Sequence, residues 1–215
     1  MDKDRLANPQ KPLAQGVLTK HEVLDGINIL QIGLTIYGVL IAFGIHILTG
    51  ILLIVLVGYT CLLARNFYMT DSITRYPLFQ ICFHHLYAWP LAFLAISAHT
   101  PDNTFNFSAW SYGTLIFCAF CLYELCHQLN PQAHPVQASA LNFYGYKIVF
   151  AFASFLLCFA LLCALFLGLD VILFPFDLAL FLTFLLLFFN HRLFYATEFT
   201  AAISLIAHSW AGAFL

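Results

Sequence analysis

The sequence predicts an all-α membrane protein, a polytopic bundle of about seven transmembrane helices. The chain is 62% hydrophobic and only 8% charged, whereas a soluble domain carries about 25% charged residues. After a polar stretch of 24 residues, apolar runs of about 20 residues follow one another. Runs of this length exceed the strands of a membrane barrel, and backbone in lipid must be hydrogen-bonded internally. Both observations favour helices.

Seven apolar runs are candidates for membrane-crossing helices, each about as long as one crossing requires. Polar segments separate most of them, whereas the breaks at Gly44–His46 and Gly168–Asp170 are short. We predict residues 1–24 as a cytoplasmic segment and residues 25–215 as one helical bundle with a cytoplasmic loop at 127–143. The predicted crossings are 25–43, 47–64, 78–99, 108–126, 144–167, 171–189 and 197–215.

The positive charges test this number of crossings. Seven crossings place the N-terminal segment and the loops at 65–77, 127–143 and 190–196 on one side. All eight Lys and Arg residues lie on that side or within one turn of it, and the opposite loops contain none. Cytoplasmic loops carry the excess of Lys and Arg. The sequence therefore predicts an integral, multi-pass membrane protein with a cytoplasmic N-terminus. The eight residues are Lys3, Arg5, Lys11, Lys20, Arg65, Arg75, Lys147 and Arg192.

The remaining composition indicates contact with lipid. The 24 Phe and 10 Tyr residues are typical of lipid-facing surfaces and interfacial belts. Most of the seven cysteines fall inside apolar runs, where thiols behave as small hydrophobic side chains. Cys118 and Cys121 have redox or metal spacing, but they lie within a crossing and no second such pair accompanies them. No basic run indicates a nucleic-acid partner, so membrane lipid is the expected surrounding.

The polar N-terminal stretch carries the most specific motif of the chain. From Asp4 to Glu22 it reads D-R-x-x-N-P-x-K-P-L-x-x-G-x-L-T-x-x-E. This string resembles the end of the first aspartate motif in the UbiA superfamily of intramembrane prenyltransferases, in which N-D-x-x-D-x-x-x-D-R precedes a similar turn and helix start. On this comparison Asp4 is the last aspartate of the motif. On the same comparison the chain lacks the start of the motif and the two crossings that precede it in the nine-helix family, which leaves seven.

A second polar cluster lies at the end of the fourth predicted crossing. Glu124 is an acid inside a membrane helix, and such residues mark functional sites by default. His127 and Gln128 follow three and four residues later on the same helix face. The segment resembles the second acidic motif of the same superfamily, closest to a divergent branch that reads E-x-x-R-K-I/L-x-P-x-E/A. On this comparison Glu124 keeps the acid, and His127 and Gln128 replace the basic pair. The resemblance also covers the stretch from Tyr76 to Leu91, where His84 or His85 matches a histidine of that branch.

The resemblance implies transfer of an isoprenyl group from a diphosphate donor to an aromatic or similar, lipid-soluble acceptor. It assigns Asp4 and Glu124 as catalytic residues that hold Mg²⁺, an ion that prefers carboxylate, phosphate and water oxygens. Arg5, Lys11 and Lys20 are placed to bind the diphosphate by charge-assisted hydrogen bonds. His127, Gln128 and His85 complete the implied substrate-binding set.

Two other functions remain open from the residues. Active relatives usually carry two or three acids in the second motif, whereas this chain has Glu124 alone there. A non-catalytic UbiA-like protein that binds an isoprenoid, a lipid or a protein partner is therefore an alternative. A small permease of seven crossings is another, although transporters often show inverted repeats and broken helices, and no internal repeat is visible here.

Overall fold

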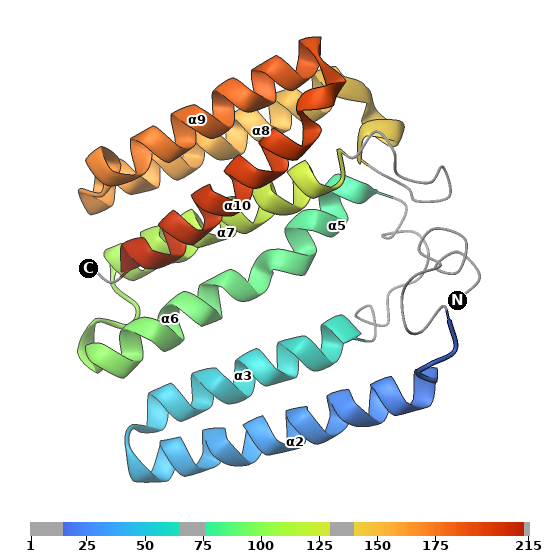
Figure 1. The fold of residues 1–215 in the computed structure, drawn as a ribbon. Coiled ribbons are helices and arrows are strands. Elements are labelled where there is room, and N and C mark those ends of the chain that lie inside the picture. Colours follow the sequence, from blue (N-terminus) through green and yellow to red (C-terminus); the bar gives the residue numbers. More distant parts are fainter. Residues whose placement is uncertain (1–14, 65–75, 130–139, 213–215) are drawn as a thin grey trace. The chain divides into compact units, whose positions relative to one another are not determined.

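Helices make up nearly all of the chain that the computed structural model describes, which comprises residues 15–64, 76–129 and 140–212. The chain divides into two compact units. Among the described residues, the first unit contains α2 and α3, and the second contains the elements from α5 to α10. We describe each unit by itself (Figure 1).

The first unit is a helical hairpin of α2 (Lys20–Gly44) and α3 (Ile47–Ala64). Thr19 and Glu22 start α2 with a capping box: the Glu22 backbone N–H donates to Thr19 Oγ1 at 3.2 Å, and the Thr19 N–H donates to Glu22 Oε2 at 2.7 Å. These bonds satisfy backbone groups that have no partner within the helix. The helix thus begins at Lys20, five residues before the predicted crossing at 25–43.

Small residues bring α2 and α3 together. A methyl group added at Gly50 would collide with the Gly38 carbonyl oxygen and with Ala42, and one added at Gly38 would lie 2.8 Å from Ile54 Cγ1. Gly38 and Ala42 are four residues apart and form one small face of α2. Such small-xxx-small faces let membrane helices approach closely enough for backbone contact.

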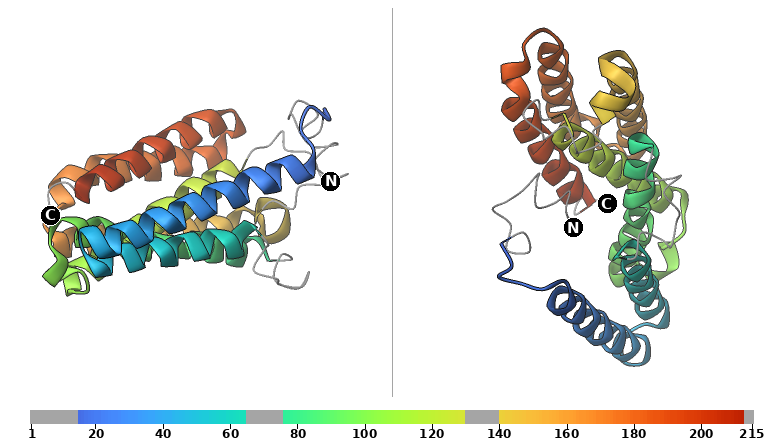
Figure 2. Two further views of the ribbon diagram at one scale, coloured as in Figure 1. Left: turned by 90° about the horizontal axis from the view of Figure 1, so that it is seen from below. Right: turned by 90° about the vertical axis from the view of Figure 1, so that its right-hand side faces the viewer.

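The second unit is an antiparallel helix bundle, and its course can be followed in Figures 1 and 2. The central helix is α7, which packs against α6, α8 and α10. The helices are α5 (Pro77–His84), α6 (Ala88–His99), α7 (Phe107–His127), α8 (Ala140–Leu167), α9 (Asp170–Phe189) and α10 (Phe194–Ala211). Short 3₁₀ turns are η2 (His85–Tyr87), η3 (Pro101–Asn103) and η4 (His191–Leu193).

Proline and glycine explain the interruptions in this bundle. Pro90 has no backbone N–H to bond the carbonyl of Leu86 one turn earlier, and its ring crowds that carbonyl. The predicted crossing at 78–99 is accordingly divided into α5, η2 and α6. Gly145 has φ 73°, in the left-handed region that favours glycine, and it separates the first turn of α8 from the long remainder.

The core of the second unit combines small side chains with leucines and other larger apolar residues, whereas the surface carries many large apolar side chains. Phe166, Val171 and Trp210 are each more than two-thirds exposed, which is the surface expected of a bundle surrounded by lipid. Four cysteines are buried, two are half-buried and Cys158 is exposed. Close helix packing through small residues is typical of membrane bundles. Buried small residues of this core are Ala88, Ala92, Cys118, Cys121, Ala153, Ala160, Cys163, Ala164 and Ala201.

The helices coincide with the seven predicted runs when α5, η2 and α6 are counted as one segment. Five of these segments within the described residues are long and apolar enough to cross a membrane: His21–Gly44, Pro77–His99, Phe107–His127, Ala140–Leu167 and Asp170–Leu187. The apolar helix Ile47–Leu63 is shorter. The prediction of an all-α, multi-pass membrane protein is thus supported by five long apolar helices.

Candidate functional site

The last turns of α7 hold the predicted acid in a partly buried position. Gln128 Nε2 donates a hydrogen bond to Glu124 Oε1 at 3.0 Å, the helical four-residue pairing that the sequence predicts. The other amide atom, Gln128 Oε1, is buried and has no hydrogen-bond partner in the part of the chain that the structure describes. The pair therefore offers one carboxylate and one unused oxygen acceptor.

His85 lies beside this pair because of the break that Pro90 introduces. Its ring stacks on Phe120 of α7, with ring centres 5.5 Å apart and planes 14° apart. Phe120 precedes Glu124 by four residues and so shares its helix face. The Glu124 carboxylate is close enough to interact electrostatically with both His84 and His85. The structure thus brings Glu124, Gln128 and His85 together.

The aromatic surroundings of His85 leave one of its nitrogens available. Nδ1 lies 3.4 Å from the Tyr87 hydroxyl, and the Tyr87 ring contacts both His85 and Phe120 edge-on. Nε2 is buried and has no hydrogen-bond partner among the residues that the structure describes. A buried polar atom without a partner costs free energy, so ligand or water contact at this nitrogen would be stabilising.

His127 has a different partner from the one that its spacing from Glu124 suggests. Its Nδ1 lies 2.6 Å from Glu198 Oε1, which joins the end of α7 to the first turns of α10. The His127 side chain is 61% exposed, and Glu198 is half-buried. The two residues are 71 positions apart, so no local pattern in the sequence reveals the pair.

The other predicted ligands cannot be placed beside this cluster. Asp4, Arg5 and Lys11 lie outside the described residues. Lys20 begins α2 in the first unit, and its side chain also lies outside the described part. Their assignment to one site remains a prediction from the resemblance.

The donor set at Glu124 fits a magnesium ion that also binds substrate. Mg²⁺ is usually held by one or two carboxylates, with waters and substrate phosphates as its remaining ligands. Glu124 provides one carboxylate, and Gln128 Oε1 provides a free oxygen. Within residues 15–64, 76–129 and 140–212, no group of three or more His, Cys, Asp or Glu side chains is placed to hold a metal by itself.

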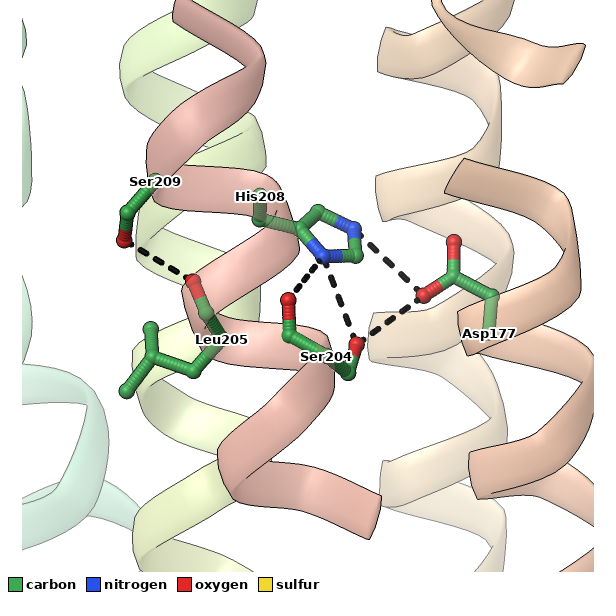
Figure 3. Close-up of polar contacts among 5 residues, drawn as sticks. All are labelled: Asp177, Ser204, Leu205, His208 and Ser209. Carbon is green, nitrogen blue, oxygen red and sulfur yellow. Dashed lines mark hydrogen bonds and ion pairs between the residues drawn. The ribbon is translucent and has the colours of Figure 1, made fainter. Parts of the chain in front are cut away.

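A second polar cluster lies inside the bundle, between α9 and α10 (Figure 3). Asp177, Ser204 and His208 are all buried. Ser204 Oγ donates to Asp177 Oδ1 at 3.3 Å, and His208 Nε2 lies 3.4 Å from the same oxygen. The sequence interpretation did not select these residues, although an acid in the middle of an apolar helix is itself a signal.

Comparison of the chain with known protein families, curated proteins and solved structures found no match.

Proposed function

We propose that the chain is a UbiA-like membrane prenyltransferase, which transfers an isoprenyl group from a diphosphate donor to an aromatic or similar acceptor. The observation that carries the proposal is the cluster of Glu124, Gln128 and His85 in the second unit, with two buried polar atoms that have no hydrogen-bond partner among the described residues. The motif resemblance from Asp4 to Glu22 supports the same conclusion.

The proposal also specifies how the helices cross the membrane. In it, all seven helical segments cross the membrane in a UbiA-like arrangement, with the N-terminus in the cytoplasm. The positions of Lys and Arg support this orientation. In the second unit, His127 at the end of α7 contacts Glu198 in the first turns of α10. Because η4 directly precedes α10, Arg192 lies at this same end of the bundle.

In this mechanism the chain binds the charged head of the donor at the end of α7. By the resemblance, Asp4 and Glu124 would hold Mg²⁺, and Gln128 beside Glu124 offers a further oxygen. The bound ion would neutralise charge on the diphosphate. Arg5, Lys11 and Lys20 would donate charge-assisted hydrogen bonds to its oxygens. The bond from the allylic carbon to the diphosphate oxygen breaks with its electron pair on the oxygen. The acceptor forms the new bond to that carbon and releases a proton.

The side chains around His85 suit the apolar part of the donor. Phe120 and Tyr87 present aromatic rings next to Glu124's helix face, and aromatic faces attract cations. Trp89 stacks on Phe117 one turn further from Glu124 along α7, with ring centres 4.5 Å apart. These rings would shield developing positive charge on the allylic carbon from water.

A second candidate function is binding of an isoprenoid or lipid without catalysis. It is favoured by the small acidic content of the cluster, because Glu124 Oε1 is already engaged by Gln128 and no group of three potential metal ligands occurs within the described ranges. A binding protein needs no metal-held leaving group. Both candidate functions require binding of the isoprenoid, but only the prenyltransferase forms a product.

An assay of the purified protein in nanodiscs, with labelled isoprenyl diphosphates and aromatic acceptors, tests both candidate functions. We expect Mg²⁺-dependent product that chelation of the metal abolishes. Glu124→Ala and Asp4→Ala should each lower the rate by about 10²-fold or more, since each removes charge that binds the transferring group. Ser209→Ala serves as the control, because its hydroxyl bonds only within α10, to the Leu205 carbonyl, on the exposed side.

Wild-type rates in both acidic variants would contradict the assigned residues. Saturable binding of the diphosphate without turnover would support the second candidate. Absence of both binding and turnover would exclude the two functions together. Elution profiles from size-exclusion chromatography confirm that each variant is folded.

A further inference from the structure

The cluster between α9 and α10 is a second ionisable site, separate from the residues of the proposed function. The exposed fractions are 6% for Asp177, 2% for Ser204 and 1% for His208. Asp177 lies seven residues into α9, an otherwise apolar helix, and follows Pro175 by two positions. An ionised side chain in such surroundings is costly unless its charge is balanced.

The hydrogen-bond geometry determines where the imidazole of His208 carries hydrogen. Nδ1 lies 2.7 Å from the Ser204 carbonyl oxygen. A carbonyl oxygen can only accept, so Nδ1 must be the donor. The neutral form of the ring then has its lone pair on Nε2, the atom that lies 3.4 Å from Asp177 Oδ1.

The proton count of the pair follows from that assignment. An ionised Asp177 and a neutral His208 would bring two lone pairs together and leave a buried negative charge. A neutral Asp177 and a protonated His208 would leave a buried positive charge. One proton carried by the pair avoids both charges. Asp177 Oδ2 and His208 Nε2 are both buried with no hydrogen-bond partner in the described chain, which makes an uncompensated charge on either group still more costly.

We propose that Asp177, Ser204 and His208 form a proton-binding site inside the membrane, in which the carboxyl group and the imidazole together hold a single exchangeable proton. The ligand is the proton itself. Ser204 orients the pair, because its carbonyl oxygen accepts from Nδ1 and its hydroxyl donates to Asp177 Oδ1. Figure 3 shows the three side chains converging between the two helices.

The site does more than tie the two helices together. Near the other end of the α9–α10 pair, neutral hydroxyl groups already connect them: Thr183 Oγ1 lies 2.8 Å from Thr200 Oγ1, and Thr197 Oγ1 donates to the Thr183 carbonyl at 3.2 Å. Hydroxyl groups of this kind suffice for association of membrane helices. Because of the acid and the imidazole, the stability of the α9–α10 packing also depends on proton binding.

Few other titratable groups surround the pair in the described elements. From α7, Cys118 is close enough to Asp177 to interact with it electrostatically, and Cys163 of α8 is in turn close to Cys118. Tyr112 of α7 donates to the Ser209 carbonyl at 3.0 Å, next to His208 in sequence. Asp170 is half-buried in the first turn of α9, and Arg192 and Glu198 lie toward the η4 end. Variants of the pair retain all of these groups, so differences from wild type report on the pair.

The test is thermal unfolding of the full-length protein in nanodiscs from about pH 5 to about pH 8, the range in which histidine changes charge. Asp177→Asn and His208→Gln each remove one ionisable group at nearly constant shape. In Asp177→Asn, the folded state resists protonation of His208 and the unfolded state does not. Stability then falls as pH decreases, because the unfolded state binds more protons. We expect a loss on the order of 5 °C across the range.

His208→Gln should show the opposite slope. Its folded state keeps Asp177 protonated, whereas the unfolded state releases that proton, so stability falls as pH increases. Wild type should be level at the acidic end and decline above about pH 6.5, where unfolded histidine is neutral and the folded pair still holds its proton. The double variant should lack both slopes, and Ser209→Ala should follow wild type.

If stability changed with pH in the same way in both single variants, the proposal would be overturned. Such a result would show that the carboxyl group and the imidazole do not share one proton. A measurement on wild type alone gives the same decision if a variant is not recovered folded. In protein with ¹⁵N-labelled histidine, the His208 ring signals should stay constant over the same pH range, with Nδ1 protonated throughout. An independent titration of His208 there would also overturn the proposal.

Discussion

At the scale of single residues, the candidate site depends on side chains whose positions are set by their neighbours. His85 is in a 3₁₀ turn because Pro90 cannot continue the hydrogen-bond pattern of the preceding helix. The turn presents the His85 ring to Phe120 on the Glu124 face of α7. The sequence indicated that His84 or His85 contributes to the site. His85 is the one that stacks on Phe120. Which of the two histidines faces Phe120 depends on the rotation of the helix before the break.

Gly113 offers a test of this packing at one residue. A methyl group there would lie 2.6 Å from Trp89 Cδ1, a contact too short to persist without movement of the indole. The Trp89 indole N–H donates to Thr114 Oγ1 at 3.2 Å, so movement also strains this bond. We expect Gly113→Ala to destabilise the protein by about 1–3 kcal/mol, the usual cost of overpacking.

The measurement is thermal unfolding together with the fluorescence of Trp89 in a variant that has Trp110 and Trp210 replaced by Phe. Gly58→Ala is the matched control, because a methyl group at that helical position meets no atom within 4 Å. Equal stability of the two variants would show that α6 and α7 do not approach as closely as described.

At the scale of elements, the α2–α3 hairpin shows how a membrane helix pair associates with few large buried side chains, Leu52 and Val57 of α3 among them. Nearly all of α2 is exposed in its own unit, including Phe43 at 90%. Its contact with α3 runs through Gly38, Ala42 and Gly50 instead. Lipid is as apolar as a leucine side chain, so close packing and dispersion contacts must hold the helices together.

Gly50→Ala should therefore weaken the hairpin. The new methyl group would collide with backbone and side-chain atoms of α2 at Gly38 and Ala42, and neither can move as the end of a flexible side chain could. We expect a cost of about 1–3 kcal/mol. Gly33→Ala, on α2 with open space around the new methyl group, should be neutral or slightly stabilising because alanine favours helices. Unfolding in nanodiscs compares the two, and a Gly50→Ala variant as stable as the Gly33→Ala variant would refute the close approach.

At the scale of the whole molecule, hydropathy and charge predict the number and the orientation of the crossings. Five long apolar helices are present in the described chain, and the remaining segments α3 and α10 lie within runs that the sequence also predicts as crossings. Seven crossings alternate the loops so that every Lys and Arg is on or near one side. An even number of crossings would place part of these charges on the opposite side.

Accessibility reporters test the orientation. A reporter at Asn103, in η3 between α6 and α7, should be accessible from outside the cytoplasm. A reporter at Gln132, in the predicted cytoplasmic loop, should be accessible only from the cytoplasm, since a single crossing separates the two positions. The same accessibility for both would refute the predicted number of crossings.

The positions of the helices were determined by the sequence itself. Apolar length is a local property that adds along the chain, and Pro90, Gly145 and the Thr19–Glu22 box act within a turn of where they stand. The four-residue pairing of Glu124 with Gln128 is local in the same way. These features could therefore be predicted without knowledge of which helices are neighbours.

The pairs that join different helices were decided by the tertiary structure alone. His127 meets Glu198 across 71 positions, and Asp177 meets Ser204 across 27. Each pair requires two helices to be adjacent and rotated so that the two faces meet, and hydropathy is nearly uniform around helices that contact lipid on most sides. The periodicity that identifies the buried face of a soluble helix is therefore weak here. The grouping of Asp177 with Ser204 and His208 consequently became apparent only from the packing of α9 on α10.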